Sequence, residues 1–167
     1  MTITFNISLL RPLLLPALAS LFAVSAAQAA DKSEPLWHKT CAKQDDTLSC
    51  FVEQFAIAQP KNVPVLRVGF DLQGGEGKAR MVVTVPLGVL LAPGLQLTVD
   101  GSKPIALPFE RCPASGCEAT AVLDTAALAK FETGKTLVVR YAVTDKASAD
   151  IPITLTGLAD ALASLSK

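Results

Sequence analysis

The stretch from residue 80 to residue 117 most constrains the fold, because its apolar residues recur at alternate positions between turn-forming residues. In residues 80–85, three apolar side chains alternate with their neighbours, which is the period of a strand with one buried face. Residues 95–99 repeat the pattern, and Asp100-Gly101 tolerates the positive φ of a tight hairpin turn. Residues 105–107 then return as the partner strand, so the sequence predicts a strand, a corner and a β-hairpin.

Similar alternation marks strands elsewhere, whereas helical periodicity is confined to two short segments. The further strands are predicted over residues 37–41, 48–58, 65–70, 135–144 and 151–155. One helix is predicted over residues 124–133, capped by Asp124 and ended by Gly134 in a left-handed conformation. A second is predicted over residues 158–165, after a polar turn at 146–150 and the last strand. The pattern predicts an all-β fold, mainly an antiparallel β-sandwich or barrel-like, with one or two short helices.

The first 29 residues have the character of a signal peptide. Arg11 precedes an uncharged apolar run, and Ala27-Gln28-Ala29 fits the small-x-small cleavage pattern, so we expect a cut after Ala29. An uncleaved membrane anchor is the alternative; prolines within the run argue against a spanning helix of about 20 apolar residues. We therefore expect a signal peptide at 1–29, a single domain at 30–167 and no stable membrane span after cleavage.

The charge of the expected mature chain argues against two classes of partner. The whole sequence has 15 basic and 15 acidic residues, and without Arg11 the balance is 14 to 15, a formal charge of −1. No basic patch of the kind that binds nucleic acid or anionic lipid is present in the sequence. We expect no nucleic-acid partner.

Four cysteines lie in the expected mature part, and an even count after a leader is typical of disulfides formed in an oxidising compartment. Three connectivities are possible, and we favour the two local pairs, Cys41–Cys50 and Cys112–Cys117. Neither pair has the Cys-x-x-Cys spacing of a zinc or thioredoxin-like site, and the sequence has one histidine. We expect no bound metal and no cofactor.

The sequence presents no catalytic constellation. A Ser/His/Asp hydrolase would need His38 as its base, and no serine sits in a Gly-x-Ser-x-Gly turn. The glycine-rich loop at 73–78 lacks the spacing of a phosphate-binding loop. Scattered carboxylates leave an uncharacterised hydrolase as a minor alternative, because such pairs form only in space. We expect no enzyme activity and name no catalytic residue.

One segment is a candidate contact surface for another protein. Between two proline-marked corners the chain presents the apolar residues Leu87, Val89, Leu90 and Leu91. The simpler interpretation is that they close one end of the core. The alternative is an exposed apolar patch that contacts a partner.

The segment VPLGVLLAPGLQLTVDGSKPIALPFERCPASGC, residues 85–117, resembles the invasion-associated locus B family. Trp37-x-x-x-Cys41, Cys50-x-x-x-Gln54 and the downstream Gly-Lys-Thr-Leu at 134–137 add to the resemblance, which covers essentially the whole chain after the leader. It implies a secreted or envelope protein of a Gram-negative bacterium, associated with virulence, and supplies no catalytic residues.

From the residues and the resemblance together, we expect an exported, disulfide-stabilised, non-catalytic binding protein of the bacterial envelope that aids host-cell association or invasion. Its partner would be a protein of the host surface or of the envelope. The expected location is periplasmic, outer-membrane-associated or secreted. A structural or accessory role within the periplasm is the alternative.

Overall fold

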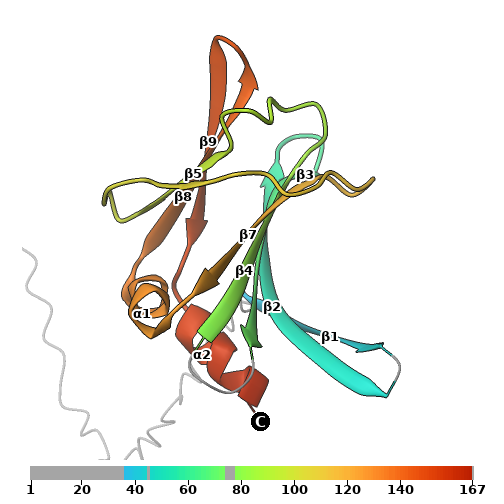
Figure 1. Cartoon of the computed structure of the whole chain (residues 1–167), viewed down its shortest axis with the longest axis vertical. Coiled ribbons are helices and arrows are strands. Elements are labelled where there is room, and N and C mark those ends of the chain that lie inside the picture. Colours follow the sequence, from blue (N-terminus) through green and yellow to red (C-terminus); the bar gives the residue numbers. More distant parts are fainter. Residues whose placement is uncertain (1–35, 45, 74–77, 167) are drawn as a thin grey trace, which may run out of the picture. The chain divides into compact units, whose positions relative to one another are not determined.

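The computed structural model describes residues 36–44, 46–73 and 78–166. The predicted leader at 1–29 and its cleavage point lie outside the described residues, and so does the middle of the glycine-rich loop at 74–77. The described residues belong to one compact unit, Glu34–Lys167, and Figure 1 shows how its strands divide into two sheets.

The first sheet has five antiparallel strands in the order β1-β2-β3-β4-β7. Its strands are β1 (His38–Gln44), β2 (Thr47–Ala58), β3 (Val63–Gln73), β4 (Lys78–Val85) and β7 (Cys117–Leu123). One face of each central strand is buried, as the alternation predicts, and the other faces outward. We call this second side the outer face.

The second sheet has four antiparallel strands in the order β6-β5-β8-β9. They are β5 (Leu95–Val99), β6 (Ile105–Leu107), β8 (Thr136–Thr144) and β9 (Ala147–Thr154). The β5–β6 hairpin turns at Asp100 (φ 47°) and Gly101 (φ 72°), and the Ser102 N–H donates to the Val99 carbonyl at 2.9 Å. The predicted tight turn is therefore confirmed.

The core lies between the inner faces of the two sheets. Phe70 is at its centre, with ring centroids 5.6 Å from Trp37 and 5.8 Å from Phe131, both in edge-to-face geometry. Two helices, α1 (Thr125–Thr133) and α2 (Leu158–Ala163), with a 3₁₀ turn at Ser164–Ser166, add buried side chains such as Leu158 and Leu162. Figure 1 shows both helices at the lower end of the sandwich. The predicted fold class, an all-β sandwich with short helices, is confirmed.

The end of α1 differs from the prediction. Asp124 caps its start by accepting the Ala127 N–H at 2.7 Å, as expected. Gly134, however, has φ −69° and ψ 163°, so the left-handed terminator is wrong. A Cβ there would lie 2.7 Å from Val99 Cγ1 and 2.8 Å from the Lys130 carbonyl oxygen. Lack of space, and not backbone handedness, requires glycine at this position.

The β8–β9 hairpin also departs from the sequence pattern. The polar turn expected at 146–150 is wrong, because β9 begins at Ala147 and pairs with β8 from there. The register shifts between Ala142 and Thr144, and Val143 is exposed although its position in the alternation predicted burial. A bulge of this kind turns the following side chains to the other face.

Candidate functional site

The connection between β4 and β5 carries the candidate contact surface, which we call the apolar corner (Leu87, Val89, Leu90 and Leu91). Leu87, Leu90 and Leu91 are 55%, 39% and 49% exposed. Val89 alone is half-buried and packs against the core. The apolar corner therefore closes the core only through Val89, because its other three side chains face solvent.

The backbone of the apolar corner is fixed to the second sheet. The Leu90 N–H donates to the Ala142 carbonyl of β8 at 2.9 Å, beside the bulge that exposes Val143. In Figure 1 the corner lies at the same end of the sandwich as the β2–β3 loop and the β8–β9 hairpin. The backbone that carries the exposed leucines is thus held to β8 by a hydrogen bond.

An apolar pocket of about 310 Å³ adjoins the corner at Pro86. Its walls include Phe55 from β2, with Pro64 and Val65 from β3. Tyr141 donates its hydroxyl hydrogen to the Val65 carbonyl at 3.1 Å, and burial raises the pKa of this phenol. Val65 is therefore joined to β8, so the two sheets are tied together beside the pocket.

The loop closed by Cys112 and Cys117 forms one border of this pocket. The two cysteines are disulfide-bonded, and Ser115 between them lines the pocket. A Cβ on Gly116 (φ +139°) would lie 2.4 Å from the Val85 carbonyl oxygen, so the loop presses against the end of β4. The disulfide loop thus has a defined position beside the apolar pocket.

Thr84 is a polar residue buried at the same place. It is 8% exposed and lines the apolar pocket, and its hydroxyl oxygen has no hydrogen-bond partner in the described part of the chain. A buried hydroxyl without a partner costs free energy. Among the described residues that line this pocket, Thr84 is the one with a buried side-chain oxygen that lacks a hydrogen-bond partner.

A second, polar pocket of about 500 Å³ continues from the first on the outer face, and the two share Arg67 and Glu118. Three ion pairs between neighbouring segments border it. In each pair the carboxylate is nearly buried and the guanidinium is more exposed. The pairs are Glu53–Arg67 (2.5 Å), Asp71–Arg80 (2.6 Å) and Glu118–Arg111 (2.7 Å).

These ion pairs and the apolar pocket are not predicted by the sequence pattern. A signal for part of the polar pocket was present, since Arg67 and Asp71 alternate with the buried residues of β3 and therefore lie on the outer face. Arg67 also stacks over the Phe51 ring, 5.2 Å from its centroid. Their partners on other strands depend on the pairing register, which the sequence pattern does not supply.

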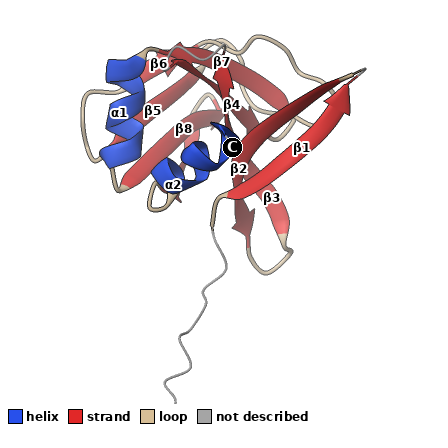
Figure 2. Ribbon diagram, turned by 90° about the horizontal axis from the view of Figure 1, so that it is seen from below, coloured by secondary structure: helices blue, strands red, loops and turns tan. Residues whose placement is uncertain are grey.

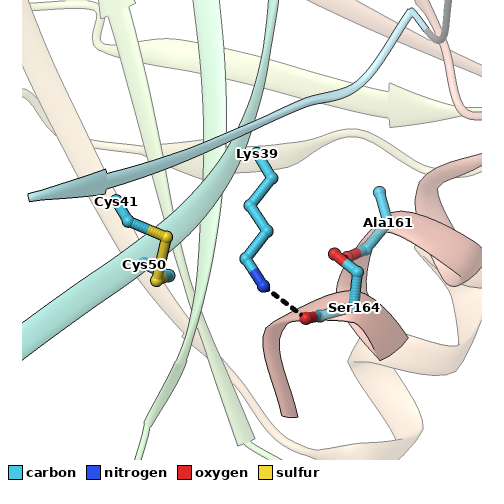
Figure 3. Close-up of a disulfide and its surroundings, with 5 residues drawn as sticks. All are labelled: Lys39, Cys41, Cys50, Ala161 and Ser164. Atoms are coloured by element: carbon cyan, nitrogen blue, oxygen red, sulfur yellow. Dashed lines mark hydrogen bonds between the residues drawn. A yellow bond between two sulfur atoms is a disulfide. The ribbon is translucent and has the colours of Figure 1, made fainter. Parts of the chain in front are cut away.

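The second disulfide, Cys41–Cys50, lies away from these pockets. The two cysteines are directly opposite in the β1–β2 register, with Cα atoms 4.0 Å apart. Figure 3 shows the disulfide beside Lys39, whose ammonium donates to the Ser164 carbonyl at 2.5 Å. This part of the hairpin is thereby joined to the C-terminal helical segment. The structure has the two local disulfides that the sequence favours.

His38, the one histidine in the sequence, is the residue that a Ser/His/Asp hydrolase would need as its base. His38 is exposed at the start of β1 and opposite Glu53 in register, but the Glu53 carboxylate accepts from Thr40 and Arg67. Within the described residues, no group of three or more His, Cys, Asp or Glu side chains is placed to hold a metal ion. No helix in that part of the chain is long and apolar enough to cross a bilayer.

Comparisons with known proteins agree on one family. A family model described as invasion associated locus B (IalB) protein matches residues 37–166. The chain is 28% identical over 127 residues to an invasion protein B homolog of Brucella abortus (strain 2308), covering 75% of this chain and 73% of the relative. It is 29% identical over 103 residues to invasion protein B of Bartonella bacilliformis, covering 61% and 54%.

A solved structure shares the fold. The crystal structure of invasion associated protein b from Bartonella henselae superposes with a TM-score of 0.71 at 24% identity, covering 81% of this chain and 93% of that one. This similarity supports the two-sheet architecture. Because the family model extends over nearly all of the described residues, the chain belongs to the invasion associated locus B (IalB) family.

Proposed function

We propose that this protein is an exported, non-catalytic binding protein of the bacterial envelope whose partner is another protein. The observation that carries the proposal is the apolar corner. Its three leucines are exposed on a backbone bonded to β8, while Val89 alone contacts the core. An exposed apolar patch is typical of a protein–protein contact site.

The neighbouring pocket favours a partner that inserts one apolar side chain. The pocket of about 310 Å³ is lined mainly by carbon atoms of Phe55, Pro64, Val65 and Pro86. Binding energy in protein interfaces concentrates where a side chain fills a pocket surrounded by less critical contacts. The corner would supply the surrounding apolar contact, and the arginines of the polar pocket would face polar groups of the same partner.

Two further features support export. Residues 1–29 have the pattern of a cleavable leader, and two disulfides are typical of proteins that fold in an oxidising compartment. The printed names of the relatives are those of invasion proteins, which favours a role in host-cell association. The proposed location is the periplasm, the outer membrane surface or the medium.

The binding proposal is tested with a photo-cross-linking amino acid at position 91 in living cells, followed by mass spectrometry of the adduct. The captured protein is then purified and its affinity measured with Leu90→Glu and Leu91→Glu. We expect each variant to keep its stability within about 0.5 kcal/mol and to bind at least about tenfold more weakly. Leu48→Glu, at a 65% exposed leucine on β2, is the matched control.

Full affinity in both corner variants would contradict the proposal, and so would unfolding of both, because that would make the corner part of the core. The compartment is tested separately by mass spectrometry and by protease treatment of intact cells. A chain beginning at residue 30 with no free thiol is expected. Resistance to protease would oppose a host-facing role and favour an accessory role within the periplasm.

A further inference from the structure

A third cavity, of about 240 Å³, lies between the β5–β6 hairpin and helix α1. Figure 2 shows the helix alongside β5 and β6. The hairpin contributes Val99, Ser102, Lys103 and Ile105, and the helix contributes Ala127, Lys130 and Phe131. None of these residues borders the two pockets near the apolar corner, so the cavity is a separate site.

The interior of this cavity is apolar and its walls are fixed. Phe131 is 1% exposed and packs edge-to-face on Phe70. The hairpin is tied to the start of β8 because the Asp100 carboxylate accepts the N–H groups of Lys135 (3.0 Å) and Thr136 (2.8 Å). A cavity between two tethered elements is preformed, which lowers the ordering cost of binding.

The charged groups that line the cavity have one sign. They are Lys103 and Lys130, and no carboxylate of the described residues lies within salt-bridge distance of either ammonium. The nearest acidic residue along the hairpin, Asp100, is engaged by backbone N–H groups. Glu132, next to Phe131 in sequence, does not line the cavity. Apolar walls with two ammonium groups are complementary to an anion with an apolar body.

We propose that this cavity binds a small amphiphilic anion, a monocarboxylate with a short aliphatic or single-ring body. The apolar body would contact Val99, Ala127 and Phe131. The carboxylate would lie between the two lysine ammonium groups, within reach of the Ser102 hydroxyl. The cavity is smaller than the range of about 300–1,000 Å³ typical of drug-sized ligands, which is why the proposed body is short.

The test is a titration of the isotope-labelled mature protein, in its oxidised form, with octanoate, followed by amide shifts in NMR spectra. Saturable shifts are expected for the amide groups of residues 99–103, 105 and 127–131; position 104 is a proline and has no amide proton. Octanamide, with the same chain and no charge, is expected to bind at least about threefold more weakly, and added salt is expected to narrow this difference. Equal binding of the two probes, or no saturable shift with octanoate, would overturn the proposal.

Substitutions then locate the site. Lys103→Gln and Lys130→Gln are each expected to weaken octanoate binding about two- to fivefold and to leave octanamide binding unchanged. Lys146→Gln, at an exposed lysine in the β8–β9 turn, is the matched control.

Ala127→Phe is expected to fill the cavity and abolish binding of both probes. Ile105→Trp, at an exposed position on the hairpin, serves the same purpose if Ala127→Phe does not fold. Unchanged octanoate binding in the cavity-filling variant would refute the assignment.

Discussion

Gly134, the residue after helix α1, provides a test of why a glycine is required at a particular position. Its φ of −69° and ψ of 163° are available to any residue. The obstacle is space, because a Cβ would approach Val99 Cγ1 at 2.7 Å, the Lys130 carbonyl oxygen at 2.8 Å and Leu155 Cδ1 at 2.9 Å. Gly134→Ala should therefore act as an overpacking substitution.

The expected cost follows from these contacts. Inserting one carbon atom into a filled site costs about 1–3 kcal/mol, and in a domain of this size each kcal/mol lowers the melting temperature by roughly 4 °C. One of the three neighbours is a backbone carbonyl, which moves less readily than a side chain. Adding Val99→Ala to Gly134→Ala removes the close contact with Val99 Cγ1. The double variant should therefore regain part of the stability that Gly134→Ala loses.

Asparagine separates the steric explanation from the left-handed one. If Gly134 were a left-handed terminator, asparagine would be the best replacement. Since crowding is the cause, Gly134→Asn should destabilise the protein at least as much as Gly134→Ala. Gly101 is the control, with φ +72° and no heavy atom within 4 Å of a Cβ. There, asparagine should be tolerated better than alanine.

The measurement is urea unfolding followed by the fluorescence of Trp37, the only tryptophan in the sequence and a buried one. The free energies of unfolding of the four variants at positions 101 and 134 are compared with that of the parent protein. A Gly134→Asn variant more stable than Gly134→Ala by over about 1 kcal/mol, a difference larger than the extrapolation error of urea unfolding, would refute the steric explanation. The same result would support a left-handed backbone conformation at Gly134 as the reason for glycine there.

Three further predictions concern the stability of the domain. Replacing Cys112 and Cys117 by serine should lower the free energy of unfolding by about 2 kcal/mol, the loop-entropy value for a short closed loop; an unchanged urea midpoint would contradict this. Phe70→Ala should cost about 3–5 kcal/mol, because its ring contacts two other buried rings, and a loss below 1 kcal/mol would show that the core re-forms around the gap. Backbone N–H groups hold the pKa of Asp100 below its usual value of 3.8. Stability from this carboxylate is therefore present above about pH 4 and lost as the pH falls through the lowered pKa, so the parent protein and Asp100→Asn should converge in melting temperature under acid conditions.

Much of the sandwich was predictable because burial of one face leaves a period of two in the sequence. Strand β4 and the β5–β6 hairpin follow that pattern closely. The first half of β9 was not predicted, for the same reason. Most of its side chains at 147–150 are exposed, so burial does not impose alternating apolar residues on this part of the strand. At position 143 the bulge reverses the alternation. Gly134 shows a further limit, since its neighbours come from three segments brought together only by folding.

The candidate sites were less predictable than the fold, because they depend on how strands pair across the sheet. Alternation assigns Arg67 to the outer face but does not show that Glu53, 14 residues earlier, lies on the neighbouring strand at 2.5 Å. A shift of two residues between the strands would keep the same faces buried, and so fit the same sequence pattern, but would remove the ion pair.

The apolar corner is a different case, because its residues are contiguous and the uncertainty was whether they are buried. A run of apolar residues between turns is equally compatible with a core plug and with a contact surface. In the structure, the hydrogen bond from Leu90 to Ala142 holds the chain so that Val89 packs inward and the leucines remain outside. The same four residues thus close the core and present an apolar surface. A charge placed on one of the leucines therefore tests binding without testing folding, whereas a charge at Val89 would test both at once.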